Sequence, residues 1–161
     1  MRNEWEREEC VIIKTMIYTK QIKKAIKIAF DAHANQKDKA GLPYILHPIH
    51  LAEQMDTEEE IIVAFLHDVV EDSSYTFEDL ESFGFSKEVM KALRLLTHAE
   101  SIPYKKYIEE IKTNPLARKV KLADLAHNSE ISRIEHPTQT DYERIQKYAD
   151  AIKVVQGEKE V

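Results

Sequence analysis

Glycine and proline are scarce in this chain, and this scarcity is the feature that most limits the folds it can adopt. Only 3 glycines and 5 prolines interrupt 161 residues, and apolar residues recur mostly at intervals of three and four. That spacing gathers apolar side chains on one face of an α-helix, whereas a half-buried strand needs them at every second residue. The sequence therefore predicts a single all-α domain, long enough to bury a core of ordinary size.

Start signals mark where the helices begin. Thr57 followed by Glu60 forms a capping box, and prolines 48, 103 and 115 stand where the first turn of a helix tolerates proline. Further N-caps are expected at Thr76, Ser86 and Thr140. The predicted helices cover residues 19–35, 48–55, 57–72, 76–83, 86–98, 103–112, 115–132 and 140–156. The main non-helical connection, "ANQKDKAGLPYILHP", is a candidate binding loop.

Composition limits the partners and the compartment. Asp and Glu number 29 against 23 Lys and Arg, giving a net charge of -6, which argues against binding to duplex nucleic acid. The single cysteine, Cys10, excludes an internal disulfide framework and cysteine-rich zinc sites. The longest early apolar run is broken by Lys14 and is too short to span a membrane. We expect a cytoplasmic protein without a membrane partner, and the sequence carries no signal of its oligomeric state.

The stretch "FLHDVVEDS" places one histidine and three carboxylates at the end of an apolar run. In a helix, His67 lies over Glu71 and Asp68 lies over Asp72. The negative end of the helix dipole disfavours these acids, and burial of an unpaired charge costs several kcal/mol. Most acidic runs are solvated helix ends, but this one belongs to an apolar helix. The combination indicates a bound divalent metal.

Two other segments supply matching ligand types. In "KLADLAHN", Asp124 lies within an apolar helix and shares one face with Lys121, His127 and Asn128. In "YILHP", His47 precedes a proline at a helix start. Taken singly, His47 is more simply a capping or packing residue, and Asp124 a salt-bridge partner of Lys121. The residues alone leave both readings open.

The order H, then HD, then D resembles the ligand pattern of the HD superfamily of metal-dependent phosphohydrolases. The surrounding sequences "GLPYILHPI", "AFLHDVVEDS" and "VKLADLAHN" are similar to the hydrolase domain of the RelA/SpoT family and its small stand-alone relatives, which include the metazoan SpoT homologues. The resemblance spans Tyr18 to Tyr148. It implies an HD-domain helical bundle over residues 16–161, with residues 1–15 as an N-terminal extension outside it.

The resemblance also implies an activity and a set of site residues. The expected reaction removes the 3′-pyrophosphate from (p)ppGpp or a related phosphorylated nucleotide. The expected cofactor is Mn²⁺, although Fe²⁺, Co²⁺ or Zn²⁺ would also accept two oxygen and two nitrogen donors. The implied metal ligands are His47, His67, Asp68 and Asp124, and the implied catalytic pair is Glu71 and Asp72. The expected substrate-binding residues are Lys39, Tyr44, Lys121 and Asn128.

Two departures from the family pattern bear on the substrate. Asp38 stands where the family often has an arginine that packs against guanine, and Leu125 stands where it has a second arginine. An aspartate offers no flat cation for stacking, so we expect weaker selection of guanine. The alternatives are an HD-domain hydrolase of another nucleotide or phosphoester, and a non-catalytic, metal-stabilised nucleotide-binding module. The acidic pair argues against the module, which has no use for it.

Overall fold

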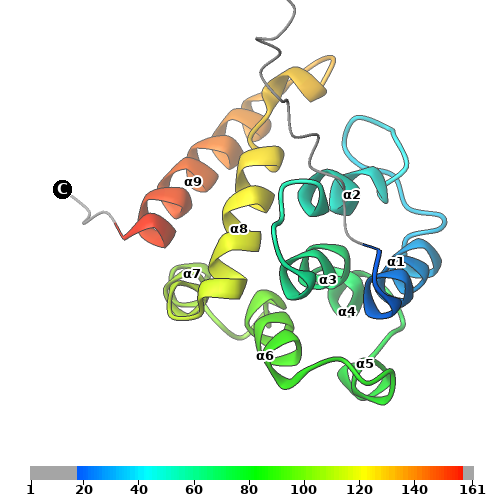
Figure 1. Ribbon diagram of the computed structural model, residues 1–161. Coiled ribbons are helices and arrows are strands. Elements are labelled where there is room, and N and C mark those ends of the chain that lie inside the picture. Colours follow the sequence, from blue (N-terminus) through cyan, green and yellow to red (C-terminus); the bar gives the residue numbers. More distant parts are fainter. Residues whose placement is uncertain (1–17, 158–161) are drawn as a thin grey trace, which may run out of the picture.

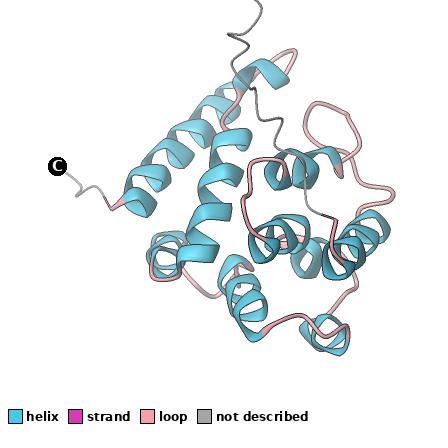
Figure 2. Ribbon diagram, in the orientation of Figure 1, coloured by secondary structure: helices cyan, strands magenta, loops and turns pink. Residues whose placement is uncertain are grey.

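The computed structural model of the protein describes residues 18–157. The expected extension over residues 1–15 lies outside that range. Within it, the regular secondary structure is helical, as Figure 2 shows. The one exception in the described range is an isolated bridge between Lys37 and Pro43. The prediction of a single all-α domain is confirmed. No helix in the described range is long and apolar enough to cross a membrane.

The helices of the described range follow one another through short connections, except for the longer loop between Ala32 and Leu46. They are α1 (Lys20–Ala32), α2 (Leu46–Ala52), α3 (Glu58–Leu66), α4 (Val69–Asp72), α5 (Phe77–Ser82), α6 (Lys87–Leu96), α7 (Tyr104–Lys112), α8 (Pro115–Asn128), the 3-10 helix η2 (Ile131–Arg133) and α9 (Gln139–Gln156). Figure 1 shows α8 running between α9 on one side and α2 and α3 on the other. Helix α8 therefore joins the two halves of the bundle.

Helix α3 forms the centre of the core. All residues from Ile61 to Leu66 are buried, because α1, α2, α6 and α8 surround the helix. Phe65, at 2% exposure, is the largest of its fully enclosed side chains, and each such side chain contributes roughly 1.5–3 kcal/mol. Since α3 has no solvent-facing stripe after its first turn, the residues that follow Leu66 emerge inside the protein.

The structure corrects the prediction of one continuous helix over residues 57–72. Helix α3 ends at Leu66 and α4 begins at Val69, with His67 and Asp68 in a turn between them. The His67 ring donates through Nδ1 to the carbonyl oxygen of Ala64 at 2.8 Å. In a continuous helix that carbonyl would accept from the N–H of Asp68. This side-chain bond competes with the helical pattern at the position where the chain presents His67 and Asp68.

Other helix ends agree with the sequence or differ by a few residues. The capping box of Thr57 with Glu60 is confirmed, as are the N-caps at Thr76 and Ser86. Helix α8 ends at Asn128, not near residue 132, because side chains bind its last carbonyls. The Ser129 hydroxyl donates to Leu125 O at 2.6 Å, and Arg133 donates to His127 O at 2.9 Å.

The N-cap of α9 is Thr138, not Thr140. The Thr138 hydroxyl accepts from the N–H of Asp141, and the Asp141 carboxylate accepts from the N–H of Thr138 at 2.9 Å. Thr140 with Glu143 repeats the same sequence signal two residues later. The earlier pair lengthens the helix by two residues, so the later threonine lies within its first turn.

The two threonines give a direct test of this helix start. Thr138→Ala should lower the free energy of unfolding by about 1 kcal/mol, because the first turn loses its side-chain acceptor. Thr140→Ala is the matched control and should change it by less than about 0.5 kcal/mol. Urea denaturation measures both. A larger loss at Thr140 than at Thr138 would place the helix start where the sequence first indicated.

Candidate metal centre and its cavities

Three elements bring a histidine–aspartate cluster together in the interior. His47 comes from α2, His67 from the turn after α3, and Asp124 from α8. One ligand-type atom from each lies within 4.8 Å of the others, and all three residues are buried. His47 Nε2 lies 3.1 Å from Asp124 Oδ1, and His67 Nε2 lies 3.9 Å from the same oxygen. A cation of modest size could contact all three.

Asp68 lies beside this cluster, at its edge. Its Oδ2 is 2.9 Å from His67 Nε2, and its side chain is 22% exposed. The hydroxyl of Tyr44 donates a hydrogen bond to the same oxygen. The sequence predicted a buried Asp68 within a helix, whereas the structure places it half-buried in the turn before α4. Tyr44 holds the carboxylate toward His67.

Hydrogen bonding fixes which nitrogen of His67 carries the proton. Its Nδ1 faces the carbonyl oxygen of Ala64, which can only accept, so Nδ1 must donate. In the neutral ring, Nε2 then carries a lone pair. That atom is buried and has no hydrogen-bond partner among the described residues. The lone pair of His67 therefore points at the carboxylates of Asp68 and Asp124.

The same reasoning applies to His47 through a longer chain of contacts. Its Nδ1 lies 2.7 Å from Nδ1 of His127, and Arg133 Nη1 lies 3.2 Å from that His127 nitrogen. Since arginine only donates, His127 Nδ1 accepts and His47 Nδ1 is the donor. Burial, with His47 and Arg133 nearby, lowers the pKa of His127 to about 4, which keeps its ring neutral. The Nε2 lone pair of His47 faces Asp124.

This donor set fits a divalent metal. Two imidazole lone pairs face carboxylate oxygens across about 3 Å, and both Nε2 atoms lack any other partner in the described part of the chain. Acceptors that point at one another repel unless a proton or a metal ion lies between them. Metal-binding histidines characteristically donate their other ring N–H to a protein oxygen or nitrogen, as His47 and His67 do here.

Charge within the cluster also favours a cation. Burial opposes ionisation of Asp124, but Lys121 at 2.8 Å and the two histidines hold its pKa well below the usual range. Burial likewise disfavours protonation of His67, yet the adjacent Asp68 outweighs it and raises the pKa of His67 to about 9, so a metal that binds here would displace a proton from Nε2. Both aspartates thus stay ionised. Asn128 orients Asp124 further, donating to its Oδ1 at 2.6 Å.

Two cavities adjoin the cluster. The first, which we call the acid cavity, has a volume of about 210 Å³ and is bordered by Asp68, Glu71, Lys121 and Asp124. The second, which we call the loop cavity, has a volume of about 200 Å³ and lies against the connection between α1 and α2. Asn128 and Tyr148 border both. An elongated ligand could therefore place one end in each cavity, with its middle next to the metal cluster.

The predicted catalytic pair differs in its surroundings. Glu71 borders the acid cavity, and its Oε2 accepts the backbone N–H of His98 at 3.2 Å. Asp72 does not border that cavity, although Gln36 fixes its backbone, donating to Asp72 O at 2.6 Å. Gln36 is in turn held by His33 at 2.7 Å. Partial desolvation raises the pKa of both carboxyl groups.

The predicted substrate residues are divided between the two cavities. Lys39 and Tyr44 border the loop cavity, Lys121 borders the acid cavity, and Asn128 borders both. Lys39 is exposed. The Lys121 Nζ bonds Asp124 at 2.8 Å, which is the salt bridge that the sequence left open as an alternative. Both lysines nevertheless face space that a ligand could enter.

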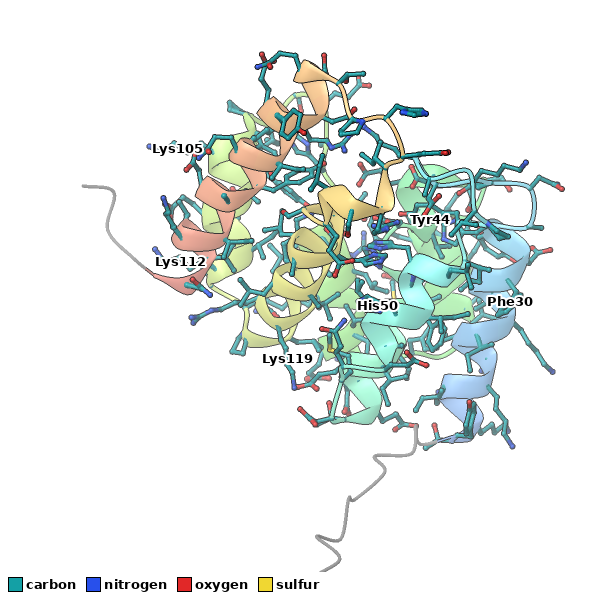
Figure 3. The ribbon with its side chains drawn as sticks, turned by 90° about the horizontal axis from the view of Figure 1, so that it is seen from above. Phe30, Tyr44, His50, Lys105, Lys112 and Lys119 are labelled. Carbon is teal, nitrogen blue, oxygen red and sulfur yellow. The ribbon has the colours of Figure 1, made fainter. Side chains whose placement is uncertain are left out.

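Sequence reasoning missed several residues of this region. His50 was not among the predicted site residues, but its ring centroid lies 4.3 Å from that of His127. Its place three residues after His47 on the same helix was the available signal. Figure 3 shows the labelled Tyr44 and His50 near the junction of α2 with α8. His98 acts on Glu71 through its backbone, which no side-chain pattern could indicate.

Comparison with known proteins identifies the family. No family model matches the sequence. The chain is 35% identical over 146 residues to the zebrafish (Danio rerio) protein named guanosine-3′,5′-bis(diphosphate) 3′-pyrophosphohydrolase MESH1, covering 82% of this chain and 81% of that protein. The chain belongs to the MESH1 family of 3′-pyrophosphohydrolases. The resemblance to the RelA/SpoT-type hydrolase domain is thereby confirmed.

Longer relatives of the MESH1 family match over one part of their length. A 3′-pyrophosphohydrolase of Aquifex aeolicus is 37% identical over 92 residues, which cover 55% of this chain but 13% of that protein. The bifunctional (p)ppGpp synthase/hydrolase SpoT of Escherichia coli is 32% identical over 123 residues, covering 68% of this chain and 18% of SpoT. The likeness therefore lies within a small portion of each bacterial protein.

A solved structure supports the same fold. It is described as "A metazoan ortholog of SpoT hydrolyzes ppGpp and plays a role in starvation responses", and it aligns over 89% of both chains with a TM-score of 0.72 at 24% sequence identity. At that identity the match speaks for the fold alone. The expected HD-type helical bundle is confirmed.

The cluster predicts stabilisation by metal. Adding Mn²⁺ at about 100 times its dissociation constant should stabilise the folded state by about 2.7 kcal/mol, which raises the melting temperature by roughly 5–10 °C for a domain of this size. His67→Ala should abolish this shift, because one buried donor is lost. Differential scanning calorimetry with and without a chelator measures it.

His136 provides the control for that measurement. It is exposed and lies outside the cluster, so His136→Ala should keep the full metal-dependent shift. Asp68→Asn serves as a second ligand variant if His67→Ala fails to fold. A full shift in the ligand variants would show that the metal binds elsewhere.

Proposed function

We propose that this protein is a metal-dependent phosphohydrolase that removes the 3′-pyrophosphate from ppGpp or pppGpp. One observation carries the proposal. Two buried histidines direct their Nε2 lone pairs at carboxylates, beside a cavity bordered by Glu71, in a chain 35% identical to a named 3′-pyrophosphohydrolase across most of both proteins.

His47, His67, Asp68 and Asp124 would hold the metal. Two nitrogen and two oxygen donors suit Mn²⁺, and Fe²⁺, Co²⁺ or Zn²⁺ would also be accepted by this set. When bound, a divalent ion would lower the pKa of a nearby water and neutralise charge that develops on the phosphoryl oxygens. The protein supplies the alignment, because Tyr44 orients Asp68 and Asn128 orients Asp124.

Glu71 is the better placed of the two candidate bases. The N–H of His98 anchors its Oε2, which fixes the carboxylate at the edge of the acid cavity. Desolvation raises its pKa, so its proton affinity is nearer to that of an effective base at neutral pH. Glu71 would accept the proton of the attacking water. Asp72, one residue further and braced by Gln36, would support the negative field that attracts the metal.

Cations near the cavities would bind the substrate. Lys121 lies at the acid cavity, where its Nζ already bonds Asp124, and would meet the pyrophosphate next to the metal. Lys39 borders the loop cavity and would attract the other phosphates of the nucleotide. Tyr44 borders the same cavity, but its hydroxyl is engaged by Asp68, so its ring and not its oxygen is available to a ligand. Asn128 lies between the two ends.

Composition supports the expected setting of this activity. The net charge of -6 and the single cysteine are consistent with an enzyme of the cytoplasm that acts on free nucleotides. They give no support to duplex nucleic acid or a membrane as a partner.

A hydrolase of another nucleotide is the second candidate. It is favoured by Asp38, which lies at the loop cavity in the position where the family resemblance leads us to expect an arginine that packs against guanine. The non-catalytic module has less support, because the acid cavity presents Glu71 beside the metal cluster.

A substrate panel separates these functions. Protein loaded with Mn²⁺ should convert ppGpp to GDP and pyrophosphate, with much slower action on 5′-nucleotides that lack a 3′-pyrophosphate. Chromatography of the products distinguishes the bond that is cut. Hydrolysis of another phosphoester but not of ppGpp would favour the second candidate, and binding without hydrolysis of any panel member would favour the module.

The acidic pair can be tested separately from the metal. Glu71→Gln should retain the metal and lower turnover by about 10²–10⁴-fold, as expected for loss of a general base. Asp72→Asn should retain the metal and lower turnover less, because it does not border the acid cavity. Asp68→Ala should lose both metal and turnover. Full turnover in both acid variants would leave Glu71 and Asp72 as surface charges.

A further inference from the structure

The loop cavity holds an arginine whose position the catalytic chemistry does not explain. Arg133 follows α8 in η2 and reaches across the cavity to the connection between α1 and α2. Its Nη2 lies 2.7 Å from Asp38 Oδ2, although the two residues are 95 positions apart in sequence. The side chain is 23% exposed. It is neither a solvated surface arginine nor a fully buried one.

The hydrogen bonds that the Arg133 head group makes within residues 18–157 are at its edge. Besides Asp38, Nη1 donates to His127 O at 2.9 Å and to His127 Nδ1 at 3.2 Å. The N–H bonds of a guanidinium lie in its plane, so bonds at its edge fix the orientation of that plane and leave its faces available. Three anchors from two separate segments hold the plane at the cavity wall.

The Asp38 carboxylate binds both Arg133 and the backbone of its own loop. Its Oδ1 accepts the N–H groups of Ala40 and Leu42 at 2.9 Å each, and its Oδ2 accepts from Arg133. Burial opposes ionisation of Asp38, but the N–H of Leu42 and Arg133 outweigh it and lower its pKa. Both oxygens are therefore occupied by donors of the protein. The negative charge at position 38 is balanced within the cavity and does not face a ligand as a lone repulsive group.

Part of the remaining wall suits the nucleoside end of a ligand. Tyr44, Tyr148 and Ile134 border the loop cavity together with Arg133, and they provide flat or apolar surface. The acid cavity, by contrast, is bordered by Glu71, Lys121 and the cluster aspartates. Since Asn128 and Tyr148 are common to both, a pyrophosphate next to the metal cluster places the rest of the nucleotide in the loop cavity.

We propose that Arg133, held in plane by Asp38, is the platform on which the base of the nucleotide stacks. Bases stack on arginine planes as they do on aromatic rings. This proposal deepens the proposed function by naming how its substrate is held. It also gives Asp38 a role, because the flat cation is Arg133 on the opposite wall and Asp38 orients it. An arginine at position 38 would place two cations against each other.

Two variants separate stacking from charge. Arg133→Lys keeps a cation but removes the plane, and Asp38→Asn keeps an acceptor for Ala40 and Leu42 while removing the charged anchor of Arg133. Arg133→Lys should raise KM for ppGpp by about 5- to 30-fold, within the range for loss of one stacked base, and change kcat less than about twofold. Asp38→Asn should raise KM in the same direction by a smaller factor. Arg118→Lys, at an arginine that borders neither cavity, is the matched control and should leave KM unchanged.

Inhibition by the two products distinguishes a platform from a phosphate-binding charge. Arg133→Lys should weaken inhibition by GDP by a similar factor and leave inhibition by inorganic pyrophosphate, which has no base, unchanged. Equal weakening of both, or an unchanged KM for ppGpp in both variants, would overturn the proposal. Metal content is measured in parallel because Arg133 also contacts His127. If Arg133→Lys loses metal, Asp38→Asn decides the matter, since it leaves the two Arg133–His127 contacts in place.

The test is independent of the proposed function. If the unaltered protein hydrolyses no ppGpp, the proposed function fails, while calorimetric binding of GDP and of pyrophosphate to the Mn²⁺-loaded protein still tests the platform. GDP binding that weakens in both variants, with pyrophosphate binding retained, would support Arg133 in that case. GDP binding that both variants leave unchanged would overturn it.

Discussion

The orientation of the candidate metal site depends on two hydrogen bonds made by the Nδ1 atoms of His67 and His47, on the side of each ring that faces away from the cluster. His67 donates through Nδ1 to Ala64 O, and His47 donates through Nδ1 to His127. Each bond directs the other ring nitrogen inward, toward ionised carboxylates, where it presents a lone pair whenever the ring is neutral. The first bond also interrupts the helix at the point where α3 is most deeply buried. The break after Leu66 and the inward direction of His67 Nε2 thus have one cause.

The cluster concentrates negative charge in a way that only a cation makes favourable. Asp68, Asp124, Glu71 and Asp72 converge around the salt bridge of Asp124 with Lys121, and burial alone would neutralise such groups. The pKa of Asp68 is instead lowered to about 2, because the adjacent His67 outweighs the effect of burial. A helical domain of ordinary size tolerates this arrangement because α3, packed on α1, α2, α6 and α8, supplies apolar burial around it. Stability resides in the core, and the acids are available for chemistry.

The sequence predicted the helices more reliably than the contacts between them. Periodicity indicated the all-α fold, and the caps at Thr57, Thr76 and Ser86 were local signals that the structure retains. The break after Leu66 could not be predicted, because it depends on a side chain competing with the backbone for one carbonyl. The pairing of Asp38 with Arg133 joins residues 95 positions apart. The family resemblance indicated that an arginine is missing at position 38, whereas the structure shows that Asp38 binds another arginine, Arg133.

The position of a bound metal tests the central claim most directly. Crystals grown with Mn²⁺ and measured near its absorption edge should show one strong anomalous peak between His47 Nε2, His67 Nε2 and the Asp124 carboxylate, with Asp68 at its side. A peak at any other location, or no peak at a saturating Mn²⁺ concentration, would contradict the claim that these histidines and aspartates form the metal site.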